Sequence, residues 1–119
     1  MRSLATVKKS QKITYDTVRR IALTLPNVKE STSYGTPALK VKDKLFVRLK
    51  EDNETIVLRM EFEQREAMMA EAPETYFITD HYRKYPCVLA RLDKLESASL
   101  RDLLRAAYRN ALAGPKSTK

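Results

Sequence analysis

Residues 38–60 read ALKVKDKLFVRLKEDNETIVLRM, and this stretch decides the fold class. Three runs rich in apolar and β-branched residues lie at 38–41, 45–50 and 55–60, and short polar segments separate them. In the middle run Leu and Val at odd positions alternate with the even positions, as in a strand with one buried face. Consecutive strands without an intervening helix pair in antiparallel order. The stretch therefore predicts an antiparallel meander with a tight turn at Lys42-Asp43.

Helices and further strands flank the meander on both sides. Upstream, the sequence predicts a helix over 15–25 capped by Thr14, and a strand over 30–34 that meets a bend or bulge at Gly35. Downstream, it predicts helices over 62–70 and from Ser97 or Ser99 to Ala113, a short helical turn from Pro73, and strands over 76–79 and 87–92. The predicted fold class is α+β, with two layers in which helices pack on one side of an antiparallel sheet.

One domain accounts for the chain. Its 119 residues suffice for one hydrophobic core, so we expect a single domain at 13–113 between a flexible basic arm at 1–12 and a flexible tail at 114–119. Cys87 is the only cysteine, which favours a buried structural thiol in a reducing compartment. No apolar run is long enough to span a membrane, and no secretory signal is found. We expect a cytoplasmic protein with no membrane partner. The oligomeric state is left open, with a monomer favoured.

Positive charge gathers at the two ends of the sequence. The net charge is +8, and six of the 23 Lys and Arg residues lie in 1–12 and 114–119, where no acid occurs. Residues 13–113 hold 17 basic and 15 acidic side chains. A basic protein is a candidate for nucleic-acid binding. A nearly neutral body with basic ends is also a common solvated pattern.

The usual signatures of enzymes and of cofactor sites are missing. Two glycines cannot build a phosphate-binding loop, and one histidine with one cysteine cannot build a Cys/His zinc site. No Gly-x-Ser-x-Gly nucleophile motif occurs. A Cys87–His81 nucleophile pair is not expected either, because no carboxylate is placed to orient the imidazole. We therefore expect no catalytic residue, no metal and no cofactor.

The densest polar segment is TDHYRKYP at 79–86. Arg83 and Lys84 could pair with phosphates, while Tyr82 and Tyr85 could stack on a ligand or donate hydrogen bonds to it. His81, the only histidine, could titrate near neutral pH. The alternative interpretation is a loop that its tyrosines anchor to the sheet, with the imidazole bonded to a backbone group.

The second candidate segment is TSYGTPALK at 32–40. Gly35 bends the entry to the next strand, and Tyr34 and Lys40 are candidate anion contacts. A basic stripe along the predicted hairpin is formed by Lys40, Lys42, Lys44, Arg48 and Lys50. The alternative interpretation is a bulged edge strand with solvated polar side chains.

These two segments, together with neighbouring strands, resemble the MmcQ/YjbR family. The resemblance is carried by SYGTPALKV at 33–41, KLFV at 44–47, DHYRKYP at 80–86 and VLARL at 88–92, and it spans residues 14–112. It implies a two-layer α+β fold likened to the CyaY (frataxin-like) fold, and DNA binding without an established reaction.

Two positions depart from the family pattern. Cys87 stands where many relatives carry an aromatic residue, often Trp, which argues against stacking at that position. Lys84 stands where glycine is common, which adds positive charge to the loop. The first predicted helix begins TYDTVRR at 14–20 and has no acidic ridge, so we expect no iron site.

Three functions remain open at this point. The leading hypothesis is a non-catalytic DNA-binding protein whose basic arm, hairpin lysines and Arg83/Lys84 loop contact phosphates. The second is a small anionic-ligand-binding domain or an enzyme, built around Tyr34, Lys40, His81, Tyr82, Arg83 and Tyr85 in one cleft. The third is a protein-interaction adaptor with an exposed apolar patch.

Overall fold

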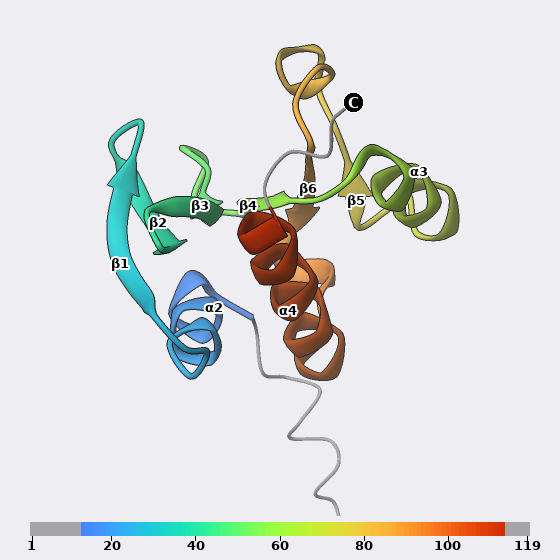
Figure 1. The fold of residues 1–119 in the computed structure, drawn as a ribbon. Helices are drawn as coiled ribbons and strands as arrows, with labels where there is room; N and C mark the ends of the chain where they lie inside the picture. The colour runs from blue at the N-terminus through green and yellow to red at the C-terminus, as the bar shows by residue number, and fades with distance from the viewer. Residues whose placement is uncertain (1–12, 114–119) are drawn as a thin grey trace, which may run out of the picture.

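The computed structural model describes residues 13–113, which contain a six-stranded antiparallel sheet (Figure 1). Its strands are β1 (Val28–Ser33), β2 (Thr36–Val41), β3 (Lys44–Leu49), β4 (Thr55–Arg59), β5 (Tyr76–Phe77) and β6 (Cys87–Arg91). Their order across the sheet is β1-β2-β3-β4-β6-β5, and every neighbouring pair is antiparallel. The predicted meander is thus confirmed, while the expected arm at 1–12 and tail at 114–119 lie outside the described residues.

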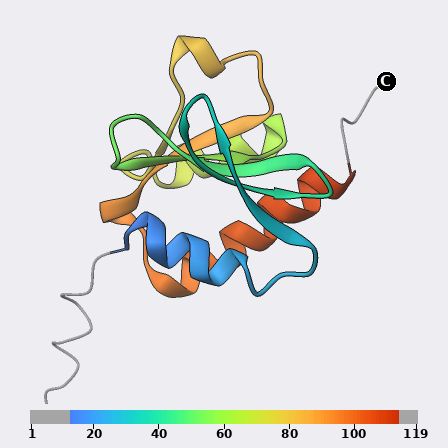
Figure 2. The ribbon, with the colours of Figure 1, turned by 90° about the vertical axis from the view of Figure 1, so that its left-hand side faces the viewer.

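Two helices cover one face of this sheet. α2 (Tyr15–Ala22) and α4 (Ser97–Ala113) lie below the sheet in Figures 1 and 2 and contact each other. α3 (Phe62–Glu71) stands next to β5 and β6. The predicted α+β class is confirmed. No helix within 13–113 combines the length and the apolar character needed to cross a membrane.

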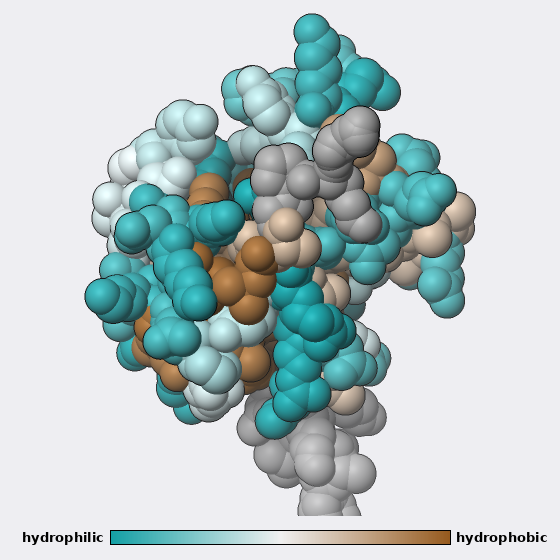
Figure 3. Space-filling view, in the orientation of Figure 1, coloured by the Kyte–Doolittle hydropathy of each residue, from teal (hydrophilic) through white to brown (hydrophobic). Residues whose placement is uncertain are grey.

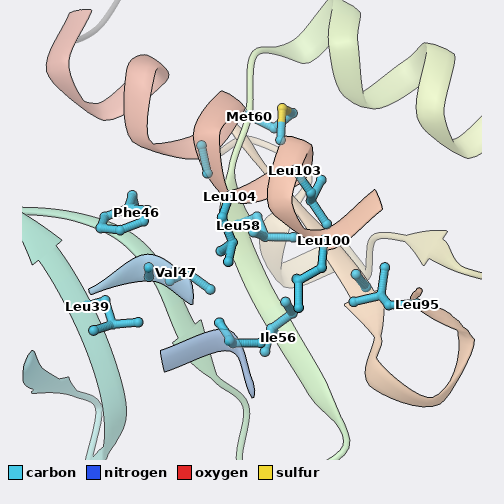
Figure 4. Close-up of a cluster of buried hydrophobic side chains, with 14 of the residues drawn as sticks. Leu39, Phe46, Val47, Ile56, Leu58, Met60, Leu95, Leu100, Leu103 and Leu104 are labelled. Atoms are coloured by element: carbon cyan, nitrogen blue, oxygen red, sulfur yellow. The ribbon is translucent and has the colours of Figure 1, made fainter. Parts of the chain in front are cut away.

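The main hydrophobic core lies between the sheet and α4. Val47 of β3 and Ile56 and Leu58 of β4 share a buried cluster with Leu100 and Leu104 of α4 (Figure 4). Positions 56 and 58 face the same side because side chains alternate along a strand. Burial of this apolar surface is the main force that holds the helices to the sheet.

Strand β3 departs from the predicted alternation. The pairing of β2 with β3 shifts by one residue after Leu39, so Phe46 becomes the extra residue of a β-bulge. Phe46 is 1% exposed, and its ring meets that of Tyr108 in α4 edge-on, with the centroids 5.7 Å apart. Arg48 on the same strand is also buried. The expectation of one exposed face is therefore wrong for β3.

Other predicted boundaries also shift. α2 ends at Ala22, three residues earlier than predicted. β1 ends at Ser33, so Gly35 belongs to a two-residue turn: of the two predicted alternatives the bend is confirmed and the bulge is not. The predicted helical turn from Pro73 is confirmed as a single turn, in which the amides of Thr75 and Tyr76 donate to the carbonyl oxygen of Ala72. Inside the predicted irregular loop, residues 80–82 form the short 3-10 helix η1.

A smaller apolar cluster lies on the other face of the sheet. Val57, Cys87 and Leu89 are buried there, with Phe77 and Tyr82 packed against them. Figure 2 shows the β1–β2 turn and the 80–86 loop on this side of the sheet, opposite α2 and α4. The turn and the loop leave a hollow between them, and this hollow is the candidate site.

Candidate functional site

The 80–86 loop is held to α3 by a buried arginine. Arg65 is 3% exposed, and its guanidinium nitrogen Nη1 donates to the carbonyl oxygens of Tyr85 at 2.8 Å, Cys87 at 3.0 Å and Tyr82 at 3.3 Å. Nη2 donates to the carbonyl oxygen of Arg83 at 2.7 Å. One side chain therefore fixes four backbone carbonyls, and the loop has a defined shape before any ligand binds.

A second buried arginine joins the loop to the sheet and to the first hairpin. Arg48 of β3 is 4% exposed, and its Nη2 donates to the hydroxyl of Tyr82 at 2.6 Å. Its Nη1 donates to the Oγ1 of Thr36 at 3.0 Å and lies 3.5 Å from a carboxylate oxygen of Glu51. The guanidinium carbon of Arg48 lies 5.1 Å from the centre of the Tyr34 ring. Arg48 therefore connects the candidate segment 32–40 with the candidate segment 79–86.

A cleft of about 380 Å³ lies between these parts. Its lining combines aromatic, apolar and cationic side chains: Tyr34, Leu45, Phe46, Arg48, Val57, Arg59, His81, Tyr82, Tyr85, Pro86 and Cys87. Two arginines and a histidine line it, and no Asp or Glu does. A concave, largely apolar surface with a few polar groups is typical of a small-molecule site. The charge of the lining favours an anion.

Arg59 differs from the two buried arginines. It ends β4, it is partly exposed, and its guanidinium has no hydrogen bond or ion pair with any residue in 13–113. A guanidinium in this state has its donors available for a carboxylate or a phosphate. Arg59 is therefore the cation of the cleft that is ready to bind a ligand.

Aromatic groups form one wall of the cleft. The rings of His81 and Tyr82 meet edge-on with their centroids 4.7 Å apart, and the Tyr85 ring lies 6.1 Å from His81. Tyr85 remains 56% exposed. The Tyr82 hydroxyl accepts a hydrogen bond from Arg48 and has no acceptor for its own proton in the described chain. That proton is a further donor for a ligand.

Cys87 lies in the lining close to three arginines. Burial raises the pKa of its thiol from 9.0 to about 11, and the positive charges of Arg65, Arg48 and Arg59 oppose only part of this shift. The thiol is therefore protonated near neutral pH. Although His81 lines the same cleft, no carboxylate of the lining is available to orient its ring.

The structure brings together four of the predicted site residues and separates the others. Tyr34, His81, Tyr82 and Tyr85 line the cleft, whereas Lys40, Lys42, Lys44, Arg83 and Lys84 do not. The Nη2 of Arg83 lies 2.7 Å from the Oδ1 of Asp80, so a carboxylate already neutralises it. Figure 3 shows hydrophilic residues covering the projecting end of this loop.

The hairpin lysines occupy a different part of the sheet. Lys40 and Lys42 line a second hollow, with a volume of about 360 Å³, next to Lys29 of β1. Glu30 and Asp43 line it as well. Lys44 is exposed and borders neither hollow. The predicted stripe of lysines along the hairpin is therefore divided.

Sequence reasoning placed Arg48 only in the basic stripe of the hairpin and did not single out Arg59. The available signal was their position inside the strongly apolar runs 45–50 and 55–60. An arginine on an inner strand lies next to apolar neighbours on both sides, so it needs either a partner or a ligand. No group of three His, Cys, Asp or Glu side chains within 13–113 is arranged to hold a metal ion.

Comparisons with known proteins agree with this fold. The family model YjbR matches residues 23–110. A crystal structure of protein DR2400 from Deinococcus radiodurans, which carries the family domain DUF419, superposes with a TM-score of 0.69 at 24% sequence identity. The superposition covers 82% of this chain and 77% of that chain. No curated protein has a significant match to the chain.

Proposed function

This chain belongs to the YjbR family, and we propose that it is a non-catalytic module that binds a small organic anion in the cleft under the 80–86 loop. One observation carries the proposal: the cleft holds the guanidinium of Arg59, which has no ion pair within 13–113, and no Asp or Glu is among the lining residues. Its volume of about 380 Å³ lies within the range of roughly 300–1,000 Å³ that is typical of small-molecule sites.

The binding mode follows from the state of each polar group. Arg59 has its donors available and binds the anionic group of the ligand. The Tyr82 hydroxyl, which accepts a hydrogen bond from Arg48, donates its own proton to the same group. Val57 and Pro86 provide apolar contacts for the rest of the ligand.

The non-catalytic part of the proposal rests on the chemistry of the lining. A thiol with a pKa of about 11 is not a nucleophile at neutral pH, because the thiolate is the reactive form. The lining holds no carboxylate for acid–base catalysis or for orienting His81. The polar groups that remain are two arginines, three tyrosines and the unoriented imidazole of His81, and they bind and position a ligand.

The test is an NMR titration of the full-length protein with phenyl phosphate. We expect shifts at the amides of Arg59, His81 and Cys87, and a loss of affinity of roughly tenfold or more in Arg59→Gln, since a charge-assisted contact is lost. Arg105→Gln is the matched control, because Arg105 is exposed on α4 at the opposite face. Equal binding by wild type and Arg59→Gln would contradict the proposal.

DNA binding by the hairpin lysines is a second candidate, and a separate observation favours it. Lys29 of β1 faces Lys40 of β2 directly, and neither has an ion pair within 13–113. Like charges opposite each other destabilise a pair of strands unless an anion lies between them. Lys42 lines the same hollow, so a backbone phosphate could contact three ammonium groups. The salt dependence of duplex DNA binding tests this candidate.

A further inference from the structure

Tyr34 adopts a backbone conformation that its residue type disfavours. The two residues between β1 and β2 are Tyr34 and Gly35, with φ angles of 55° and 80°. Positive φ at both positions is the signature of a type I′ turn, for which Asn-Gly is the preferred sequence. A bulky residue at positive φ is an outlier, because its Cβ crowds the backbone.

The side chain of Tyr34 gains little from burial in this position. It is 80% exposed, the highest value among the large hydrophobic side chains exposed within 13–113. Its ring lies over the guanidinium of Arg48, but Arg48 already has hydrogen bonds to Thr36, Leu49 and Tyr82. Neither turn preference nor packing explains a tyrosine here. Backbone strain of this kind is concentrated at functional sites.

We propose that Tyr34 is the ligand-selecting residue of the cleft, and that the ligand carries a planar aromatic ring next to its anionic group. This inference rests on the proposed function. Tyr34 lines the cleft from the first hairpin, whereas Tyr82 and Tyr85 line it from the loop. A planar ring between them stacks on aromatic faces while Arg59 binds the anionic group.

The second hairpin of the sheet offers a matched control for the turn. Lys42 and Asp43, between β2 and β3, also have positive φ angles, 49° and 67°. Lys42→Asn introduces the preferred residue far from the cleft, so we expect a rise in Tm of about 2–5 °C without a change in ligand binding. Tyr34→Asn relieves the same strain and loses only the exposed ring contact with Arg48, so we expect its Tm to equal or exceed that of the wild type.

The decisive experiment compares two probes of the same charge and similar size, phenyl phosphate and cyclohexyl phosphate, by NMR titration of the full-length protein. We expect wild type to bind phenyl phosphate about 3- to 10-fold more tightly, since only its ring is planar and aromatic. Tyr34→Leu should lose this preference, and Tyr34→Phe should keep it. Both variants keep a bulky side chain at the positive-φ position, so the strain of the turn is matched between them.

The possible outcomes separate the two proposals. If neither phosphate binds wild type, the proposed function fails and this inference falls with it. A second outcome is that both phosphates bind wild type and that Arg59→Gln binds them more weakly. If the ratio of the two affinities is then the same in wild type and in Tyr34→Leu, only the role of Tyr34 is overturned. A fall in the Tm of Tyr34→Asn by more than about 5 °C would also overturn it, because Tyr34 would then be serving the fold.

Discussion

Cys87 illustrates how this fold sets the chemistry of one side chain. The thiol belongs to the small apolar cluster on the face of the sheet opposite α2 and α4, where Leu89 and Val57 exclude water. Removal from water disfavours the charged thiolate more than the nearby arginines favour it. The same atom in the unfolded chain ionises at a lower pH, so folding and ionisation are coupled.

This coupling predicts a pH dependence of stability between about pH 9 and 11. The folded pKa of Cys87 is raised to about 11 from 9.0, so its contribution is fully present below pH 9 and is lost as the pH rises towards 11. We expect the difference in unfolding free energy between wild type and Cys87→Ala to shrink over this interval in urea titrations. Tyr15, whose pKa is raised to about 12, is common to both proteins.

A difference that stays constant with pH would contradict this prediction. A thiol reagent gives a second readout at pH 8. It should modify the native protein more slowly than the urea-unfolded protein, because the native thiol is both buried and protonated.

At this scale the sequence identified the aromatic half of the cleft, but it placed Arg48 only in a basic stripe of the hairpin and did not single out Arg59. His81, Tyr82 and Tyr85 are conspicuous because they crowd into one short polar segment. Arg48 and Arg59 are not, because a charge in an alternating strand usually faces solvent. Arg48 can be buried because it has hydrogen-bond acceptors, and one of them, the Tyr82 hydroxyl, comes from a loop 34 residues further along the chain.

Among the elements, α3 and the 80–86 loop depend on each other. α3 carries few buried side chains, and its buried residue Arg65 is the one that reaches the loop carbonyls. Its Nε has no hydrogen-bond partner, so all the hydrogen bonds of this guanidinium are donated by its two terminal nitrogens. The Phe62 ring, 4.8 Å away, covers it from one side.

Removing this arginine should destabilise the protein strongly. We expect Arg65→Met to lower the unfolding free energy by about 3 kcal/mol, because several carbonyls lose their donor in a buried place. Arg65→Lys should recover only part of the lost unfolding free energy, since one ammonium group cannot reach all four carbonyl oxygens that the guanidinium now contacts. Urea unfolding measures both.

Glu66→Gln is the control for a charge effect. The Glu66 carboxylate lies 3.8 Å from Arg65 but is exposed, so its loss should change stability by less than about 1 kcal/mol. If Glu66→Gln and Arg65→Met had equal effects, the ion pair and not the carbonyl contacts would hold the loop.

The two hairpin turns show what could be predicted about elements. Lys42-Asp43 was predictable, since it separates two apolar runs by the two residues that a tight hairpin requires. At Tyr34-Gly35 the bend was predictable from the glycine, but the two-residue turn was not, because tyrosine is not a turn residue. The bulge at Phe46 could not be predicted from the sequence either, since one extra apolar residue within an apolar run does not change the pattern.

For the whole molecule, the fold was more predictable than the cleft. The order of helices and strands follows from periodicity along the chain, and antiparallel neighbours need no long-range information. The cleft combines Tyr34, Arg59 and the 80–86 loop, which are far apart in the sequence. Their meeting depends on buried contacts made by Arg48 and Arg65, which no local pattern reveals.

Charge is also a property of the whole molecule, and it decides how DNA binding should be tested. The body at 13–113 has nearly balanced charge, whereas residues 1–12 contain four cations and no acid. A basic segment alone gives salt-dependent binding to any polyanion. Binding of duplex DNA by the full chain therefore says little until the contributions of the hairpin and of residues 1–12 are separated.

We expect Lys29→Gln/Lys40→Gln/Lys42→Gln to reduce the slope of log K against log salt concentration by about 2 to 3, since these three lysines line one hollow and each phosphate contact contributes roughly 0.9. The matched control is Arg101→Gln/Arg105→Gln/Arg109→Gln, which removes three exposed cations from α4 on the opposite face. A slope changed equally by both triple variants would reflect net charge alone. A slope changed only when Arg2, Lys8, Lys9 and Lys12 become Gln would leave the sheet without a role in DNA binding, because phosphate contacts made by the hairpin must appear in the salt dependence.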